Sequence, residues 1–158
     1  MEVTLLEMLE ARERRALRQQ ALLAQHGRTM VCFTMNIAGP VKNSPLIRRG
    51  YALGKKRLRQ QLRLAGIGVA YFEEIQEKTG NEAIFLLDAA PLAVKQVTVE
   101  IEDHAPIGRL FDMDVLCPDG RKVDRQELGF SGRKCLICGA PAQPNCSLGN
   151  GHSYPNGV

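Results

Sequence analysis

Two aspartates spaced two residues apart, Asp112 and Asp114, are the residues of this sequence whose type and spacing most directly suggest chemistry. Apolar residues alternate with them through the segment GRLFDMDV at residues 108–115, and a period of two is typical of a β-strand with one buried face. Both carboxylates then lie on the other face, with Cα atoms roughly 6.5–7 Å apart.

Carboxylates this close repel each other and need a cation, a shared proton or nearby Lys or Arg side chains. Mg²⁺ suits them, because it prefers oxygen ligands and uses one or two carboxylates while keeping sites for water and phosphate. An exposed strand with a solvated acidic face is the alternative, since Asp-x-Asp is a short pattern.

A second candidate site is the loop at residues 37–44, which holds Gly, Pro, a lysine and a serine and precedes a helical pattern. Ser44 is a suitable N-cap and a proline follows it, so we expect a helix to begin there. Exposed amides at a helix start, with Lys42, Arg48 and Arg49 nearby, would bind an anion such as phosphate. The G-x-x-x-x-G-K spacing of a Walker loop is absent, and a purely structural capping turn is the alternative.

The C-terminal part of the sequence contains a possible zinc site. Cys135 and Cys138 have the spacing of a zinc knuckle, and Cys146 with His152 could complete a tetrahedron around Zn²⁺. Free cysteines that bind no metal are the alternative. The ending is rich in Gly, Asn and Pro, so we expect residues from about 131 to 158 to form a Cys-rich, partly disordered tail.

The composition is that of an ordinary soluble protein. Of 158 residues, 44% are hydrophobic and 24% are charged, which suits a single domain with a substantial core. The N-terminus lacks a basic-then-apolar signal, and no apolar run approaches the roughly 18 residues of a membrane span. Five cysteines in a chain without an export signal favour a cytoplasmic location.

The charges are distributed unevenly along the chain. The net charge is only +4, but residues 14–72 contain twelve Lys or Arg and no acidic residue. This asymmetry favours a polyanionic ligand or an acidic protein partner, with a solvated basic face as the alternative. A zinc-knuckle module that binds nucleic acid is a second interpretation of the same features. Aromatic residues, at 5% and with no Trp, leave few stacking platforms for bases, so we regard nucleic acid as an unlikely partner.

Five stretches of the sequence together resemble one family, the apo-citrate lyase phosphoribosyl-dephospho-CoA transferases, also called holo-citrate-lyase synthases. The motif GRLFDMDV is also similar to one in the related transferases of malonate decarboxylase, so that motif alone does not select the substrate protein. The other four stretches follow the same family order and extend the resemblance from about residue 5 to about residue 146. The five are LEMLEARERR at 6–15, NIAGPVKNSPLIRR at 36–49, TGNEA at 79–83, GRLFDMDV at 108–115 and RKCLIC at 133–138.

The resemblance implies a nucleotidyltransferase. Such an enzyme moves the 2′-(5″-phosphoribosyl)-3′-dephospho-CoA group from its triphosphate precursor to a serine of the acyl carrier (gamma) subunit of citrate lyase, and pyrophosphate leaves. Both the precursor and a typical acyl carrier are anionic, which matches the acid-free stretch. The same chemistry on a malonate decarboxylase carrier is the alternative within this class.

For that reaction the sequence suggests a set of roles. Asp112 and Asp114 would hold Mg²⁺, and one of them would help to deprotonate the serine. Arg109 and Lys42 would stabilise the leaving pyrophosphate, because in-line attack needs the phosphate charge neutralised. Further substrate-binding residues come from the loop and the helix start: Asn36, Ser44, Arg48 and Arg49.

The elements that must position these residues can be predicted from local patterns. Thr4 and Glu7 fit a capping box, and a helix should follow to about residue 25. After it we expect a strand at 29–36, a helix from Ser44, strands at 69–76 and 82–87, a helix at 88–103 and the aspartate strand. The valines and isoleucine of the 88–103 segment also suit a strand. If that segment is helical, the result is an α+β single domain with an extra N-terminal helix and a mixed or antiparallel sheet, for which the ferredoxin-like split βαβ arrangement is one candidate.

Overall fold

Local capping signals begin and end the N-terminal helix of the computed structural model, which describes residues 1–129. The hydroxyl of Thr4 accepts a hydrogen bond from the amide of Glu7, whose side chain accepts one from the amide of Thr4. Gly27 ends the helix in the left-handed conformation, with φ +60°. This capping box and glycine stop confirm the predicted helix, α1 (Leu5–His26).

Proline begins each of the two other long helices, α2 (Pro45–Leu64) and α3 (Pro91–His104). Ser44 caps α2 by accepting a hydrogen bond from the amide of Ile47, as the sequence predicts. The ambiguous segment at 88–103 is helical. Its buried residues Val94, Thr98 and Ile101 recur at helical spacing.

The strands form one antiparallel sheet in the order β2-β3-β1-β4-β5. The first four strands, with α2 and α3, give the strand–helix–strand–strand–helix–strand order and the split βαβ connections of a ferredoxin-like fold. This confirms the predicted fold class and specifies an antiparallel sheet. The strands are β1 (Thr29–Met35), β2 (Val69–Glu77), β3 (Gly80–Leu87), β4 (Phe111–Leu116) and β5 (Lys122–Val123).

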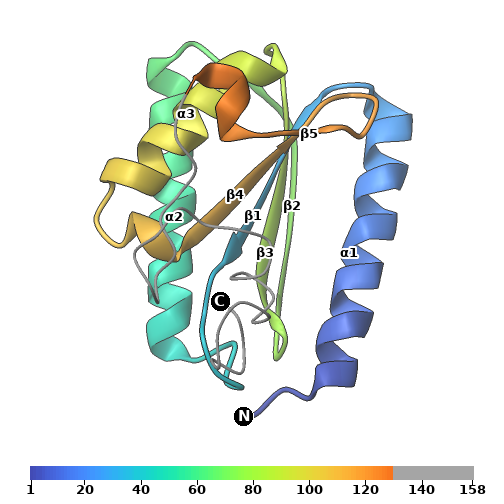
Figure 1. Cartoon of the computed structure of the whole chain (residues 1–158), viewed down its shortest axis with the longest axis vertical. Coiled ribbons are helices and arrows are strands. Elements are labelled where there is room, and N and C mark those ends of the chain that lie inside the picture. The colour runs from blue at the N-terminus through green and yellow to red at the C-terminus, as the bar shows by residue number, and fades with distance from the viewer. Residues whose placement is uncertain (130–158) are drawn as a thin grey trace.

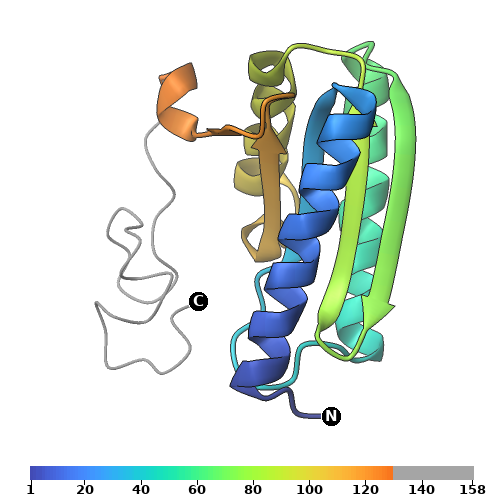
Figure 2. The ribbon, with the colours of Figure 1, turned by 90° about the vertical axis from the view of Figure 1, so that its right-hand side faces the viewer.

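Helices cover both faces of this sheet. Helices α2 and α3 lie together on one face and α1 lies alone on the other (Figure 1). Turned by 90°, α1 runs along the sheet in front of the strands (Figure 2). Among residues 1–129, no helix is long and apolar enough to cross a membrane.

The main core lies between the sheet and the α2–α3 layer. Phe33 of β1 stacks on Tyr51 of α2 and meets Phe111 of β4 edge-to-face, with ring centroids 5.4 Å apart in both pairs. Helix α2 approaches the sheet closely at Gly54, where an added Cβ would lie 2.3 Å from the Phe33 ring. A smaller apolar cluster lies between the sheet and α1, and it consists of Leu22, Leu23, Met30, Cys32, Ile84 and Leu86.

One detail of the predicted aspartate strand is wrong. Residues Gly108–Leu110 form a 3₁₀ turn, and the strand begins at Phe111. The amide of Gly108 donates to the carbonyl of Ala105, and the turn approaches the end of α3 so closely that a Cβ added to Gly108 would lie 2.4 Å from the carbonyl oxygen of Ile101. The turn lifts Arg109 out of the strand and leaves both aspartates within it.

Candidate active site

The aspartates lie on the face of β4 that looks toward α1. Along β4 the residues alternate between buried and half-buried, with Phe111, Met113 and Val115 in the main core and Asp112 and Asp114 on the opposite face. This alternation is the predicted one. The two carboxylates are therefore held side by side on a strand whose other face is anchored by fully buried side chains.

The carboxylate of Asp112 is placed where a negative charge is unfavourable. Burial, together with the charges of Asp114 and Glu102, raises the pKa of Asp112 to about 7. Asp114 has a compensating partner, because its carboxylate lies 3.0 Å from the ammonium of Lys122 on β5. Although burial opposes it, the proximity of Asp114 and Asp112 raises the pKa of Lys122 above its usual value. Each acid of the pair thus has a different electrostatic environment.

A third carboxylate lies on the same face of the sheet. Thr34 of β1 pairs with Asp112 on one side and with Glu82 of β3 on the other, so Asp112 and Glu82 are two strands apart, roughly 10 Å. Glu82 is buried, and two guanidinium groups of α1 neutralise it: Arg14 at 3.2 Å and Arg15 at 3.4 Å. These contacts place the LEMLEARERR motif (residues 6–15) beside the TGNEA motif (residues 79–83).

The loop at residues 37–44 is attached to the β2–β3 hairpin. Asn43 and Asn81 exchange side-chain amide hydrogen bonds of 3.1 Å, and Asn43 also donates to the carbonyl of Glu77. Lys42 donates to the carbonyl of Ile37 at 2.6 Å. Burial, with a contribution from the charge of Arg12, lowers the pKa of Lys42.

The predicted anion site at the start of α2 is partly occupied by the chain itself. The Ser44 hydroxyl accepts from Ile47, and the Asn43 side chain accepts from the amide of Ser44 at 3.0 Å. Two amides of the helix start are thereby used in capping. Arg48 and Arg49 are exposed on α2, across the sheet from the aspartates, so these two arginines are not brought together with Asp112.

Arg109 and Asn36 lie nearer to the aspartates. The amide of Asn36 donates to the carbonyl of Leu110 at 2.7 Å, so the end of β1 lies beside the turn that carries Arg109. Arg109 is exposed at the start of β4. The structure therefore places Asn36 and Arg109 at the end of β4 where Asp112 begins the acidic pair.

The site residues predicted from the sequence do not include four residues of this face: Arg14, Arg15, Glu82 and Lys122. A signal existed for Lys122, because the Pro118–Asp119–Gly120 turn predicts a return strand that brings residues 121–123 beside the end of β4. The pairing of Leu116 with Lys122 is the outcome. The contact between Arg15 and Glu82 joins residues 67 positions apart and has no local signal.

The donor set of the acidic pair fits Mg²⁺. Within the described part of the chain, no three His, Cys, Asp or Glu side chains gather closely enough to hold a metal ion. Two adjacent carboxylates that lack full neutralisation match an ion that takes one or two protein oxygens and completes its shell with water and phosphate.

The cysteines divide between the described and undescribed residues. Cys32 and Cys117 are buried and free, and burial raises the pKa of the Cys32 thiol to about 12, which makes it a poor nucleophile. The predicted zinc ligands Cys135, Cys138, Cys146 and His152, and the predicted tail from about residue 131, lie outside the described residues.

Comparisons with known proteins give one consistent result. The family described as apo-citrate lyase phosphoribosyl-dephospho-CoA transferase (CitX) matches residues 3–156. A protein of that name from Citrobacter koseri is 34% identical over 151 residues, which cover 96% of this chain and 82% of the relative. Another, from Escherichia coli O7:K1, is 33% identical over 150 residues, covering 95% and 81%. The Protein CitXG of Haemophilus influenzae is 33% identical over 143 residues, which cover 89% of this chain and 30% of that longer protein.

Proposed function

The chain belongs to the apo-citrate lyase phosphoribosyl-dephospho-CoA transferase family, and from this we propose the reaction that it catalyses. It transfers the 2′-(5″-phosphoribosyl)-3′-dephospho-CoA group from its triphosphate precursor to a serine of the citrate lyase acyl carrier subunit, and pyrophosphate is released. The observation that carries this assignment is the family match across residues 3–156, which includes the aspartate strand. The family match gives no support to the nucleic-acid-binding alternative.

Asp112 and Asp114 are the proposed ligands of a Mg²⁺ ion. When bound there, the ion would neutralise phosphate charge as the α-phosphorus is attacked. The half-buried position of the pair, on a strand fixed by Phe111, Met113 and Val115, supports this role, because rigid placement of ligands favours a defined geometry. Lys122, at 3.0 Å from Asp114, pairs with that carboxylate and would add a positive charge beside the phosphates.

Asp112 is the better candidate for the base that accepts the serine proton. In the metal-free protein, burial and the charge of Asp114 raise the pKa of Asp112, so this carboxylate accepts a proton more readily than an exposed aspartate does. The carboxylate of Asp114 is instead engaged by the ammonium of Lys122. Division of the two roles between the carboxylates follows from their different neighbours.

Positive residues from the turn before β4 and from the loop at residues 37–44 would bind the donor. Arg109 and Lys42 would stabilise the leaving pyrophosphate, with Asn36 and Ser44 contributing polar contacts along the loop. Arg48 and Arg49 lie on the opposite side of the sheet from the acidic pair. We assign these two arginines to the carrier or to the distal part of the triphosphate precursor.

The proposed partner is an acidic acyl carrier, and the proposed location is the cytoplasm. The acid-free stretch at residues 14–72 supports an anionic partner. The acceptor experiment therefore compares two carriers, the apo acyl carrier subunit of citrate lyase and that of malonate decarboxylase.

Mass spectrometry of the apo carrier tests the proposal. The carrier is incubated with the protein, Mg²⁺ and 2′-(5″-triphosphoribosyl)-3′-dephospho-CoA, and the expected result is a mass increase equal to the prosthetic group. Asp112→Asn and Asp114→Asn should each reduce the rate by about 10²–10³-fold, the size typical of a lost electrostatic contact in a transition state. Asp119→Asn, which removes an exposed carboxylate from the turn before β5, is the matched control and should leave the rate unchanged.

Three outcomes would contradict parts of the proposal. Transfer at the wild-type rate by both aspartate variants would remove the metal and base roles and keep the reaction. Transfer to the malonate decarboxylase carrier alone would change the acceptor. Absence of transfer from the wild-type protein to either carrier would overturn the proposed reaction.

A further inference from the structure

The outer edge of β4 is paired with a strand along only part of its length. Strand β5 pairs with Val115 and Leu116, and in the described part of the chain no strand pairs with the outer edge at Asp112 and Met113. A backbone amide at such an edge needs an acceptor, because an unpaired buried N–H is costly. The amide in question belongs to Met113, the residue between the two aspartates.

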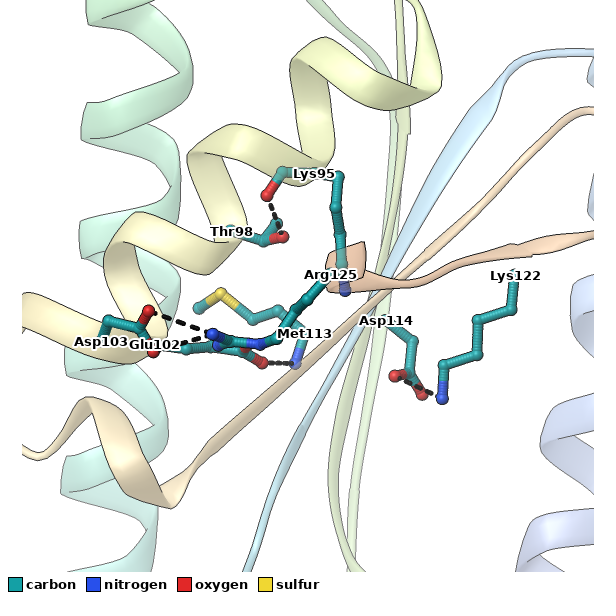
Figure 3. Close-up of polar contacts among 8 residues, drawn as sticks. All are labelled: Lys95, Thr98, Glu102, Asp103, Met113, Asp114, Lys122 and Arg125. Carbon is teal, nitrogen blue, oxygen red and sulfur yellow. Dashed lines mark hydrogen bonds and ion pairs between the residues drawn. The ribbon is translucent and has the colours of Figure 1, made fainter. Parts of the chain in front are cut away.

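Helix α3 supplies the acceptor. The amide of Met113 donates to Glu102 Oε2 at 2.8 Å, a contact between a backbone group and a carboxylate that is only 4% exposed (Figure 3). Figure 3 shows Glu102 on one side of β4 and the Asp114–Lys122 pair on the other. Glu102 therefore does not face the substrate side of the strand.

The second oxygen of Glu102 is also engaged. Arg125 donates to Glu102 Oε1 at 2.8 Å and to Asp103 Oδ2 at 3.0 Å. Arg125 is itself largely buried, with 10% of its side chain exposed. A carboxylate with both oxygens hydrogen-bonded in the interior has little freedom to move.

A close backbone contact fixes the start of the same strand. A Cβ added to Gly108 would lie 2.4 Å from the carbonyl oxygen of Ile101 and 2.8 Å from that of Glu102. Only glycine allows the turn before β4 to approach the end of α3 this closely. The turn before β4 thus packs against α3 at Gly108, and β4 itself is hydrogen-bonded to α3 at Met113.

We propose that Glu102 is a positioning residue: by accepting the hydrogen bond of the Met113 amide, it fixes the stretch of backbone that sets the spacing of the Asp112 and Asp114 carboxylates. This inference rests on the proposed function, in which those carboxylates bind Mg²⁺. Partners that orient metal ligands typically change metal affinity or activity by 10–100-fold when they are removed.

Two double variants isolate the hydrogen bond from the ion pair. Both Glu102→Gln/Arg125→Met and Glu102→Leu/Arg125→Met remove the buried charges, and replacement of a buried ion pair by apolar groups is often well tolerated. They differ in one respect, because only Gln offers an oxygen to the Met113 amide. Asp103→Asn, which affects the Arg125 contact but not Met113, is a further control.

Three quantities are measured on the full chain well below its unfolding temperature: Mn²⁺ affinity without substrate, hydrogen exchange of the Met113 amide, and kcat for transfer. We expect the Gln double variant and Asp103→Asn to remain within about threefold of wild type in Mn²⁺ affinity and kcat, with a protected Met113 amide. The Leu double variant should lose 10–100-fold in Mn²⁺ affinity and in kcat, with KM little changed and the Met113 amide exchanging faster.

Equal Mn²⁺ affinity and equal kcat in the two double variants would overturn the positioning role while leaving the proposed function intact. If the wild-type chain neither binds Mn²⁺ through Asp112 and Asp114 nor transfers the group, the positioning role falls together with the proposed function. Mn²⁺ titrations of Asp112→Asn and Asp114→Asn separate these two cases.

Discussion

Helices α2 and α3 cover one face of the sheet with aromatic and aliphatic side chains, whereas α1 covers the other face largely through charged ones. On the first face Phe33, Phe85 and Phe111 are almost completely buried. On the second face, arginines of α1 form ion pairs with Glu73 and Glu82, and the apolar cluster is smaller. The proposed chemistry lies on the charged face.

This division separates stability from activity. Hydrophobic burial contributes most of the free energy of folding, so the α2–α3 face supports the whole sheet. The charged face holds two carboxylates whose mutual repulsion opposes folding, as is common for functional groups. Strand β4 joins the two, because Phe111 and Met113 face the core while Asp112 and Asp114 face α1. Substitutions on either face therefore test whether stability and activity are separated in this way.

The largest expected effect on stability comes from Phe33→Ala. Phe33 is fully buried and contacts Tyr51 and Phe111, so its truncation should lower the free energy of unfolding by about 3–5 kcal/mol. Chemical denaturation measures this change. The transfer rate, measured at low temperature on folded protein, should fall by less than about tenfold. A loss of transfer as large as that of Asp112→Asn, without unfolding, would contradict the division between the faces.

Asp112→Asn should have the opposite effect on stability in metal-free protein. The pKa of Asp112 is about 7 in the folded state against a usual value of 3.8, so the folded protein binds more protons between these values. The contribution of Asp112 to the free energy of unfolding is fully present below about pH 4 and is lost as the pH rises through about 7. The variant lacks this loss and should be more stable than wild type by about 1–2 kcal/mol at pH 8, a value discounted for solvent screening.

Thermal unfolding of both proteins at pH 4.5 and pH 8, in the presence of a chelator, measures the difference. The advantage of the variant should shrink at the lower pH, and addition of Mg²⁺ at pH 8 should stabilise only the wild type. A variant that is less stable than wild type at pH 8 without metal would show that Asp112 is not under electrostatic strain.

Arg15→Ala should have a smaller effect. Its partner Glu82 is buried, and Arg14 remains to neutralise it, so we expect a loss of about 1 kcal/mol in the free energy of unfolding. Arg18→Ala, which breaks the exposed pair with Glu73, is the matched control and should have the smallest effect of all. Urea denaturation at low and high salt distinguishes them, because salt should abolish the Arg18 effect first. If Arg15→Ala and Arg18→Ala lowered the free energy of unfolding by the same amount at both salt concentrations, this ranking would be contradicted.

The fold could be predicted from the sequence because its signals are local. The capping residues Thr4 and Ser44, the glycine stop at Gly27 and the alternation along β4 each act within a few residues. The aspartate pair was predicted for the same reason. The 3₁₀ turn at Gly108 was missed, because it depends on contact with α3.

The surroundings of the pair could not be predicted in the same way. Glu102 reaches Met113 from a helix, and Arg14 and Arg15 reach Glu82 from the other end of the sequence. Such contacts depend on how the layers pack, and periodicity in one segment carries no information about them. The electrostatic difference between Asp112 and Asp114 depends on these same contacts, so it became apparent only in three dimensions.

The central position of β1 has a consequence for how the protein is made. Strand β4 pairs with residues of β1 that precede it by 76 to 86 positions, so β1 can pair with β4 only after residues 111–116 have been synthesised. Contacts this distant in sequence slow folding, because a long loop must close first. The carboxylates take their final place only when β4 docks beside β1. The nascent chain on the ribosome can thus build the β2–β3 hairpin before it completes the acidic pair, which requires β4.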